Sequence, residues 1–355
     1  MKILYAIQGT GNGHLSRARD IIPLLQQKGE LDILVSGVQA DVALPYPIKY
    51  KFRGLSFIFG KKGGVDLWAT FKNMKTRQLL QEIKSLPVKE YDLIINDFEP
   101  VSAWACKLQN VPIIGLSHQS AVISKNAPRA VKKDWMGHLI LQHYAPVNIN
   151  YGFHFERYDD HIFTPVIRQQ VRELVASDEG HYTVYLPSYQ DDLLIKHLTR
   201  FPNAKWEVFS KHNSEPLRVQ NVSIYPINNE DFVNSMAKSK GVLCGAGFET
   251  PAEALHLGKK LLVIPMRNQY EQALNAAALY QMGIPVIKSL KRKHYPIISD
   301  WIENGKQGDV NYPDITQDIL NWIIDEHYYK NANAENNFYA AIDKLYAGIQ
   351  RKPAF

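Results

Sequence analysis

The segment CGAGFETPAEALHLGKKLLVIPMRNQYEQALN, residues 244–275, decides the fold class of this chain. A short apolar run that ends at Cys244 predicts a strand, and Gly245 and Gly247 then predict a tight turn. Residues 249–257 follow with helical character. A strand, a glycine turn and a helix start leave unpaired backbone N–H groups at the positive end of a helix dipole. Such a turn either binds a diphosphate without a metal ion or is the solvated start of an ordinary βαβ unit.

Polar residues follow this turn at spacings that suit a nucleotide sugar. Glu253 lies six residues after Gly247, one turn into the predicted helix, where a carboxylate can accept hydrogen bonds from both hydroxyls of a ribose. A second predicted strand, 261–264, ends at Pro265, and Arg267 just after it is a candidate phosphate contact. The next predicted helix opens with four polar side chains that can contact sugar hydroxyls, namely Gln269, Glu271, Gln272 and Asn275.

The order of these residues resembles the C-terminal half of GT-B glycosyltransferases. The shared features are the glycine followed by Glu253, then Gly258-Lys259, Ile264-Pro265, Glu271-Gln272 and Asn275-Ala276. The nearest likeness is to the lipid-linked N-acetylglucosaminyltransferase of peptidoglycan synthesis and to the plant and bacterial UDP-glycosyltransferases. Lys259-Lys260 departs from the family pattern, in which a Gly-x-Pro turn is more usual.

The resemblance implies a role for each residue of this segment. Glu253 would bind the ribose of the donor nucleotide, whereas Glu271, Gln272 and Asn275 would bind the donor sugar. Ile227, in an earlier Tyr-Pro-Ile-Asn segment, would meet the nucleotide base. The residues of the turn that would face the diphosphate are Gly245, Ala246, Gly247, Phe248, Glu249 and Thr250.

A second glycine loop lies near the N-terminus. Residues 2–7 predict a buried strand, QGTGNGH follows, and the residues after it have helical periodicity. A dinucleotide fold would require glycine at position 14, where helix and strand pack closely, but this chain has His14, which argues against a nicotinamide oxidoreductase. From the residues alone His14 is a helix-start residue. The resemblance implies instead that His14 is the general base and that Gly11, Asn12 and Gly13 contact the acceptor.

Two carboxylates follow the predicted strand 93–95. Asp97 and Glu99 lie where ligands gather in parallel α/β sheets, although either could simply cap the helix that opens at Pro100. The resemblance implies that Asp97 orients His14, with Glu99 as the reserve candidate. His118 ends the next predicted strand, where it either lines the acceptor cleft or lies in the core.

Composition limits the classes of function. With 355 residues and 45% hydrophobic content, the chain suits two domains, and no apolar run approaches the ~18 residues that span a bilayer. Its two cysteines are far apart in sequence, so we expect neither a disulfide framework nor a cysteine metal site, and we expect a cytoplasmic protein. The net charge of +6 favours anionic ligands, but without an arginine-rich tract or a nucleic-acid motif we expect no nucleic-acid partner.

Two segments of the first half suit either an acceptor or a core. The glycine-rich stretch 54–68 combines apolar residues with two lysines, as expected for an acceptor loop or for a buried strand and turn. Residues 124–144 place four basic residues before an apolar stretch that contains Trp135. Such a stretch either contacts an anionic membrane at its inner face or packs as an ordinary amphipathic helix.

We therefore expect an α/β protein of GT-B fold, with two Rossmann-like domains that face each other across a cleft. Residues 1–163 would bind the acceptor, 164–327 the nucleotide sugar, and 328–355 would form a helix that crosses back to the first domain. The expected reaction is metal-independent, inverting transfer from a nucleotide diphosphate sugar, UDP-linked, to a hydroxyl of a lipid or glycan, without a cofactor. The alternatives are a nucleotide-sugar hydrolase or epimerase of the same fold, or a non-catalytic protein that binds nucleotide sugars.

Overall fold

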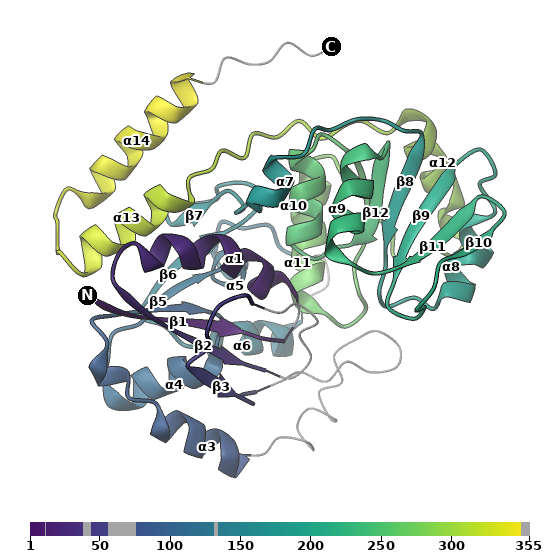
Figure 1. Cartoon of the computed structure of the whole chain (residues 1–355). Helices are drawn as coiled ribbons and strands as arrows, with labels where there is room; N and C mark the ends of the chain where they lie inside the picture. Colours follow the sequence, from purple (N-terminus) through teal and green to yellow (C-terminus); the bar gives the residue numbers. More distant parts are fainter. Residues whose placement is uncertain (11, 38–43, 56–75, 131–133, 349–355) are drawn as a thin grey trace.

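The computed structural model describes residues 1–355 except 11, 38–43, 56–75, 131–133 and 349–355. Its strands form two sheets (Figure 1). The first is parallel and contains, in spatial order, β3 (Tyr50–Phe52), β2 (Glu30–Ser36), β1 (Lys2–Gln8), β4 (Leu93–Asp97), β5 (Ile114–Ser117), β6 (Ile149–Phe153) and β7 (Ile162–Phe163). The second contains β10 (Leu217–Val219), β11 (Val222–Pro226), β9 (Lys205–Ser210), β8 (His181–Tyr185), β12 (Gly241–Gly245) and β13 (Lys260–Ile264), and only its β10–β11 pair is antiparallel.

Helices connect the strands and cover the sheets. Those of the first half are α1 (Asn12–Gln26), α3 (Thr76–Ser85), α4 (Pro100–Gln109), α5 (His118–Val122) and α6 (Trp135–His143), with a 3₁₀ turn at Val88–Glu90. A short helix, α7 (Gln169–Arg172), lies in the connection between the two sheets. The second half adds α8 (Asp191–Leu198), α9 (Asn229–Lys238), α10 (Glu249–His256), α11 (Tyr270–Gln281) and α12 (Tyr295–Asn304), with a 3₁₀ turn at Arg292–His294, before α13 (Thr316–His327) and α14 (Ala334–Gly348).

The apolar pattern explains why these segments take these forms. Six of the seven residues of β1 are buried, as expected for a parallel strand covered by helices on both faces. In α1 the buried apolar residues recur every three or four positions and form one stripe that packs on the sheet, namely Leu15, Ala18, Ile21, Ile22 and Leu25. The predicted α/β class, with two Rossmann-like sheets, is confirmed.

The carboxyl ends of both sheets border one pocket. In the first sheet, β1 runs into the glycine loop and α1, and in the second, β12 runs into the glycine turn and α10. Residues from both strand-to-helix turns line the same pocket, as do residues that follow β11 and β13. Ligands of open α/β sheets bind at this edge, so the arrangement places any shared ligand between the two sheets.

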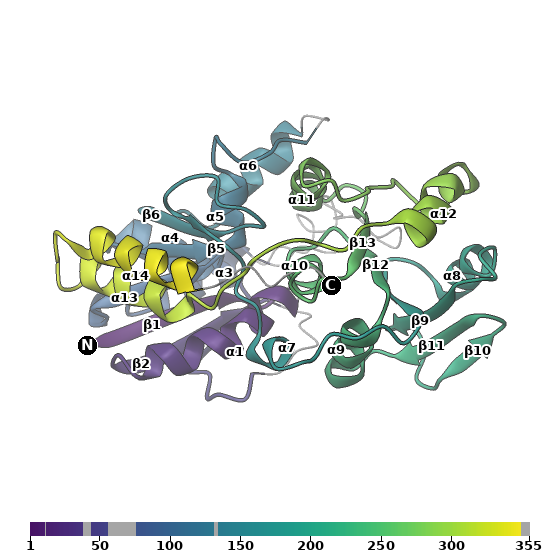
Figure 2. The ribbon, with the colours of Figure 1, turned by 90° about the horizontal axis from the view of Figure 1, so that it is seen from above.

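The chain returns to the first sheet before its end. The segment after α12 runs back from the second half to α13, which lies beside α1 and β6 (Figure 2). Trp322 of α13 packs against Tyr151 of β6, with ring centroids 5.3 Å apart, and α14 packs on α13. By these contacts α13 accompanies the first sheet, whereas the sequence-based division assigned residues 164–327 to the second domain.

Two segments that the sequence singled out, 54–68 and 124–144, are described only in part. Of the stretch 54–68 only Gly54 and Leu55 are described. In 124–144 the helix is α6, and its Trp135 is 69% exposed. Among the described residues, none of the helices combines the length and the apolar character needed to cross a bilayer.

We predict that Trp322→Ala lowers the free energy of unfolding by about 3–5 kcal/mol, because it removes a large ring from a closed aromatic cluster. Trp322 is 2% exposed and contacts Phe163 and Phe338 as well as Tyr151. Urea unfolding followed by circular dichroism measures the change. Trp135→Ala is the matched control, since this exposed tryptophan should change stability by less than about 0.5 kcal/mol. Equal effects of the two substitutions would contradict the packing of α13 described above.

Candidate functional site

His14 and Asp97 form a hydrogen-bonded pair at the carboxyl edge of the first sheet. β1 and β4 are neighbours, with Ile7 opposite Asp97, so the last residue of β4 faces the first turn of α1. His14 Nδ1 lies 2.8 Å from Asp97 Oδ1. Because an ionised carboxylate only accepts hydrogen bonds, Nδ1 carries the proton and Nε2 presents its lone pair to the pocket. The structure thus brings together the two residues that the sequence paired.

Arg17, which the sequence analysis did not single out, holds Asp97 from the other side. Its Nη2 lies 2.8 Å from both carboxylate oxygens of Asp97, and its Nη1 donates to Glu249 at the start of α10. Burial alone would raise the pKa of Asp97, but the Arg17 guanidinium and His14 outweigh burial and hold that pKa below its ordinary value. Asp97 is therefore ionised at neutral pH and keeps His14 in the tautomer described above.

Glu99 does not belong to the site, contrary to its place as a reserve catalytic residue. Phe98 has left-handed backbone (φ 57°), which turns the chain after Asp97 and directs Glu99 toward the helix start. The Glu99 carboxylate caps α4 by accepting from the N–H groups of Val101 and Ser102, and it also accepts from the Ser36 hydroxyl. Glu99 is fully buried and lines neither of the two pockets beside His14.

The turn between β12 and α10 forms one wall of the larger pocket. Gly247, Phe248, Glu249 and Thr250 line it, whereas Gly245 and Ala246 lie behind them at the strand end. The N-cap residue of α10, Phe248, makes no capping hydrogen bond through its side chain, so it leaves the first N–H groups of the helix available to an acceptor. An added Cβ at Gly247 would meet no atom within 4 Å, so the backbone there is open to a ligand. The arrangement is that of an anion site at a helix start.

Glu253 lies on the inner face of α10 and is held by Arg168 from the connection between the sheets. The Arg168 Nε and Nη2 atoms donate to the two carboxylate oxygens at 2.5 and 2.8 Å, and Nη1 donates to Asn229. Burial raises the pKa of Glu253, and the ion pair with Arg168 opposes that rise. Each carboxylate oxygen retains a further lone pair, which leaves room for two ribose hydroxyls. Sequence reasoning missed Arg168 because it lies in a connecting segment.

The polar residues of α11 have three different positions. Glu271 accepts from Gln119 Nε2 at 2.9 Å and borders both pockets. Gln272 lines the larger pocket and accepts from the Met266 N–H through Oε1. Asn275 is fully buried, donates to the Ala246 carbonyl, and places Oδ1 2.7 Å from His118 Nε2. It therefore joins the two halves internally and is not available to a donor sugar, although the resemblance had implied that role.

His118 is buried, which is one of the two positions that the sequence left open. Its ring stacks on Phe248, with centroids 3.9 Å apart and planes at 6°, so it supports the turn between β12 and α10. Only its edge reaches the larger pocket, because it is 1% exposed. Burial lowers the pKa of His118. It does not line the smaller pocket beside His14, so it does not carry the acceptor role that the sequence suggested.

The remaining candidates divide between the pocket and the surface. Ile227, Asn12 and Gly13 line the larger pocket, Gly11 lies outside the described residues, and Arg267 is exposed and lines neither pocket. Further lining residues that sequence reasoning did not name are Arg19, Tyr185, Lys211, Asn229 and Phe232. The larger pocket has a volume of about 760 Å³, within the range of small-molecule sites.

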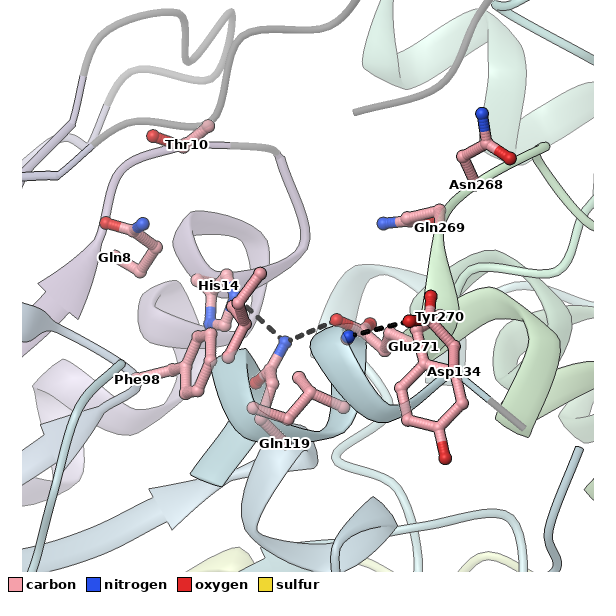
Figure 3. Close-up of a pocket in the computed structure, with 13 residues that line it drawn as sticks. Gln8, Thr10, His14, Phe98, Gln119, Asp134, Asn268, Gln269, Tyr270 and Glu271 are labelled. Carbon is pink, nitrogen blue, oxygen red and sulfur yellow. Dashed lines mark hydrogen bonds between the residues drawn. The ribbon is translucent and has the colours of Figure 1, made fainter. Parts of the chain in front are cut away.

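A smaller pocket opens on the other side of His14 (Figure 3). Its walls include Phe98, Leu141 and Tyr270, and its polar residues include Gln8 and Asp134. His14, Gln119 and Glu271 form a row at the boundary between the two pockets, and hydrogen bonds connect them in that order. The residues common to both pockets are Thr10, His14, Gln119, Gln269 and Glu271. No cluster of three or more acidic, histidine or cysteine side chains suited to a metal ion occurs among the residues that the structure describes.

Solved structures of similar fold include several nucleotide-sugar enzymes. UGT89C1 of Arabidopsis thaliana, complexed with quercetin, matches with a TM-score of 0.55 at 11% identity, over 97% of this chain and 99% of that chain. The calicheamicin glycosyltransferase CalG4 matches with a TM-score of 0.55 at 12% identity, over 99% of both chains. A Listeria monocytogenes protein assigned as a UDP-N-acetylglucosamine 2-epimerase matches with a TM-score of 0.50 at 12% identity, over 100% of this chain and 99% of that chain. At such identities these likenesses show the fold, which is GT-B.

The sequence itself identifies the family. No curated protein matches the chain. The model of glycosyl transferase family 1, however, matches residues 1–303, which is most of the 355 residues and includes both glycine turns, His14, Asp97 and Glu253. With a GT-B fold and a family match of this extent, the chain belongs to glycosyl transferase family 1 and is a glycosyltransferase.

Proposed function

We propose that the protein transfers a sugar from a nucleotide diphosphate sugar, UDP-linked, to an acceptor hydroxyl with inversion at the anomeric carbon. The observation that carries this proposal is the position of His14. Its unprotonated Nε2 lies at the boundary between a pocket large enough for a nucleotide sugar and a second pocket that can hold an acceptor. A base at such a boundary can accept a proton from one ligand while that ligand attacks the other.

The donor would occupy the larger pocket from α9 to α11. Its diphosphate would face the N–H groups at the start of α10, its ribose would bind Glu253, and its base would lie near Ile227. The sugar would reach Glu271 and Gln272, which border the same pocket. UGT89C1 has been solved with UDP and with UDP-L-rhamnose, and its similarity in fold supports a donor of this class.

The reaction follows from this placement. His14 Nε2 takes the proton of the acceptor hydroxyl as the oxygen attacks the anomeric carbon from the face opposite the diphosphate. The bond between the anomeric carbon and the diphosphate oxygen breaks, and its electron pair remains on that oxygen. Asp97 stabilises the imidazolium that forms at His14.

Charge on the leaving diphosphate would be stabilised by fixed groups of the protein. The helix start supplies oriented N–H dipoles. Arg17, Arg19, Arg168 and Lys211 also line the larger pocket. This supply of positive charge supports metal-independent transfer, in which cations and dipoles of the chain take the place of a divalent ion.

The smaller pocket indicates an acceptor with an apolar body. Phe98, Ile140, Leu141 and Tyr270 contribute apolar side chains to its wall. On the outer side of α6, Trp135, Met136 and Leu139 are exposed by 69%, 41% and 43%. An apolar pocket beside an exposed apolar helix face supports a lipid acceptor presented at the inner surface of a membrane.

A hydrolase or an epimerase would use the same donor site without an organic acceptor. The Listeria protein, which is assigned as an epimerase, has a similar fold. The apolar pocket beside His14 favours transfer, because neither water nor a bound donor requires apolar walls at that position. Product analysis in the absence of acceptor separates these functions, since a transferase releases little free sugar under conditions in which a hydrolase releases it continuously.

We predict that His14→Ala lowers the rate of transfer by about 10²–10⁴-fold, the usual contribution of a positioned general base. Affinity for UDP should change by less than about threefold, because the proposed nucleotide contacts come from α10 and the residues around Ile227. A radiolabelled-sugar transfer assay and calorimetric titration measure the two effects. His143→Ala, an exposed histidine at the end of α6, is the control and should retain full transfer. Retained transfer in His14→Ala would refute the assignment of His14 as the general base.

We also predict that Glu253→Gln weakens the binding of UDP by about 10- to 100-fold, the loss expected for hydrogen bonds to a charged group. Calorimetric titration of the purified variant measures the change, and its thermal unfolding is compared with that of the native protein because Arg168 loses its ion pair. Glu230→Gln is the matched control. Glu230 is an exposed acid at the start of α9 that lines neither pocket. Unchanged affinity in a folded Glu253→Gln variant would exclude Glu253 from the ribose site.

A further inference from the structure

Glu249 places a negative charge where the diphosphate of a donor would bind. It is the first residue of α10, and its side chain extends across the cleft to α1. There the carboxylate lies against Gly13, so closely that a Cβ at that position would overlap it, and Oε1 accepts from Arg17 Nη1 at 2.5 Å. A carboxylate at a helix start is favourable in the absence of another anion. A bound diphosphate and the Glu249 carboxylate, however, would compete for the same Arg17 guanidinium.

Arg17 connects this carboxylate to the catalytic pair. Its Nη2 is occupied by Asp97, which in turn binds His14. Its Nη1 donates to Glu249, and both residues line the larger pocket. Its buried Nε has no acceptor among the described residues. The guanidinium is 2% exposed. A buried donor without a partner is costly, so Arg17 has hydrogen-bonding capacity beyond its contacts with Asp97 and Glu249.

We infer that Arg17 is a donor-binding residue that contacts the diphosphate, and that Glu249 occupies its place when the donor is absent. This inference rests on the proposed function. On donor binding the Glu249 carboxylate turns toward solvent, to which it is already 23% exposed, and Arg17 Nη1 donates to a phosphate oxygen instead. One guanidinium then contacts both the leaving group and Asp97. It therefore couples occupation of the donor site to the position of the general base, His14.

The test uses UDP as the probe and calorimetry as the readout. Glu249→Gln keeps the shape of the side chain but removes the competing charge, so the affinity for UDP should rise by about tenfold, the lower end for a hydrogen bond to a charged group. In the background of Arg17→Gln, the same substitution should change affinity by less than about twofold, because the donor that Glu249 blocks is gone. Glu303→Gln, an exposed acid on α12, is the matched control for net charge and should leave the affinity unchanged.

Each outcome distinguishes this inference from the proposed function. If the native protein binds none of UDP, GDP and dTDP, the proposed function fails, and the inference with it. If the native protein binds UDP but Glu249→Gln binds it equally or more weakly, only the inference fails. An equal gain in Glu303→Gln would also overturn it, since the effect would then come from net charge alone. If Arg17→Gln does not fold, the comparison of Glu249→Gln with Glu303→Gln still decides the question.

Discussion

The buried ion pair between Arg17 and Asp97 is the interaction on which the site depends. Asp97 has no exposed surface, and a carboxylate in that position would be strongly destabilising without a cation and further hydrogen bonds. The pairing of β1 with β4 brings Asp97 to the start of α1, whose first two turns supply His14 and Arg17. The same contact that compensates a buried charge therefore fixes the tautomer and direction of the residue assigned as the base. The Asp97 carboxylate thus contributes both to the stability of the fold and to the orientation of His14.

The two halves of the protein meet through polar pairs that belong to the cleft. Arg17 contacts Glu249, Gln119 contacts Glu271, and His118 contacts Asn275, in each case from the first half to the second. Arg168, in the connection between the sheets, holds Glu253. Phe248 stacks on His118 beside these pairs. A ligand between the sheets would touch or displace several of these contacts, so donor binding and the relative position of the two halves are physically linked.

Much of this architecture could be predicted from sequence because its determinants are local. Buried runs followed by glycine turns mark β1 and β12, and helical periodicity marks α1 and α10. The roles of Arg17 and Arg168 could not be predicted, because their partners Asp97 and Glu253 lie 80 and 85 residues away and an isolated arginine has no distinguishing pattern. The residue pattern alone did not distinguish Asp97 from Glu99, because the left-handed backbone of Phe98 is what directs one to the cleft and the other to a helix cap. Asn275 fits the family pattern, but its neighbours enclose it.

The central claim is that one cleft between the two sheets holds the donor nucleotide, with His14 at its inner end. A crystal structure of the protein soaked with UDP tests this claim most directly. We expect electron density for the diphosphate at the start of α10, for the ribose against Glu253 and for the nucleotide base beside Ile227. Density for the nucleotide outside this cleft, or a reversed orientation with the diphosphate at Ile227, would contradict it.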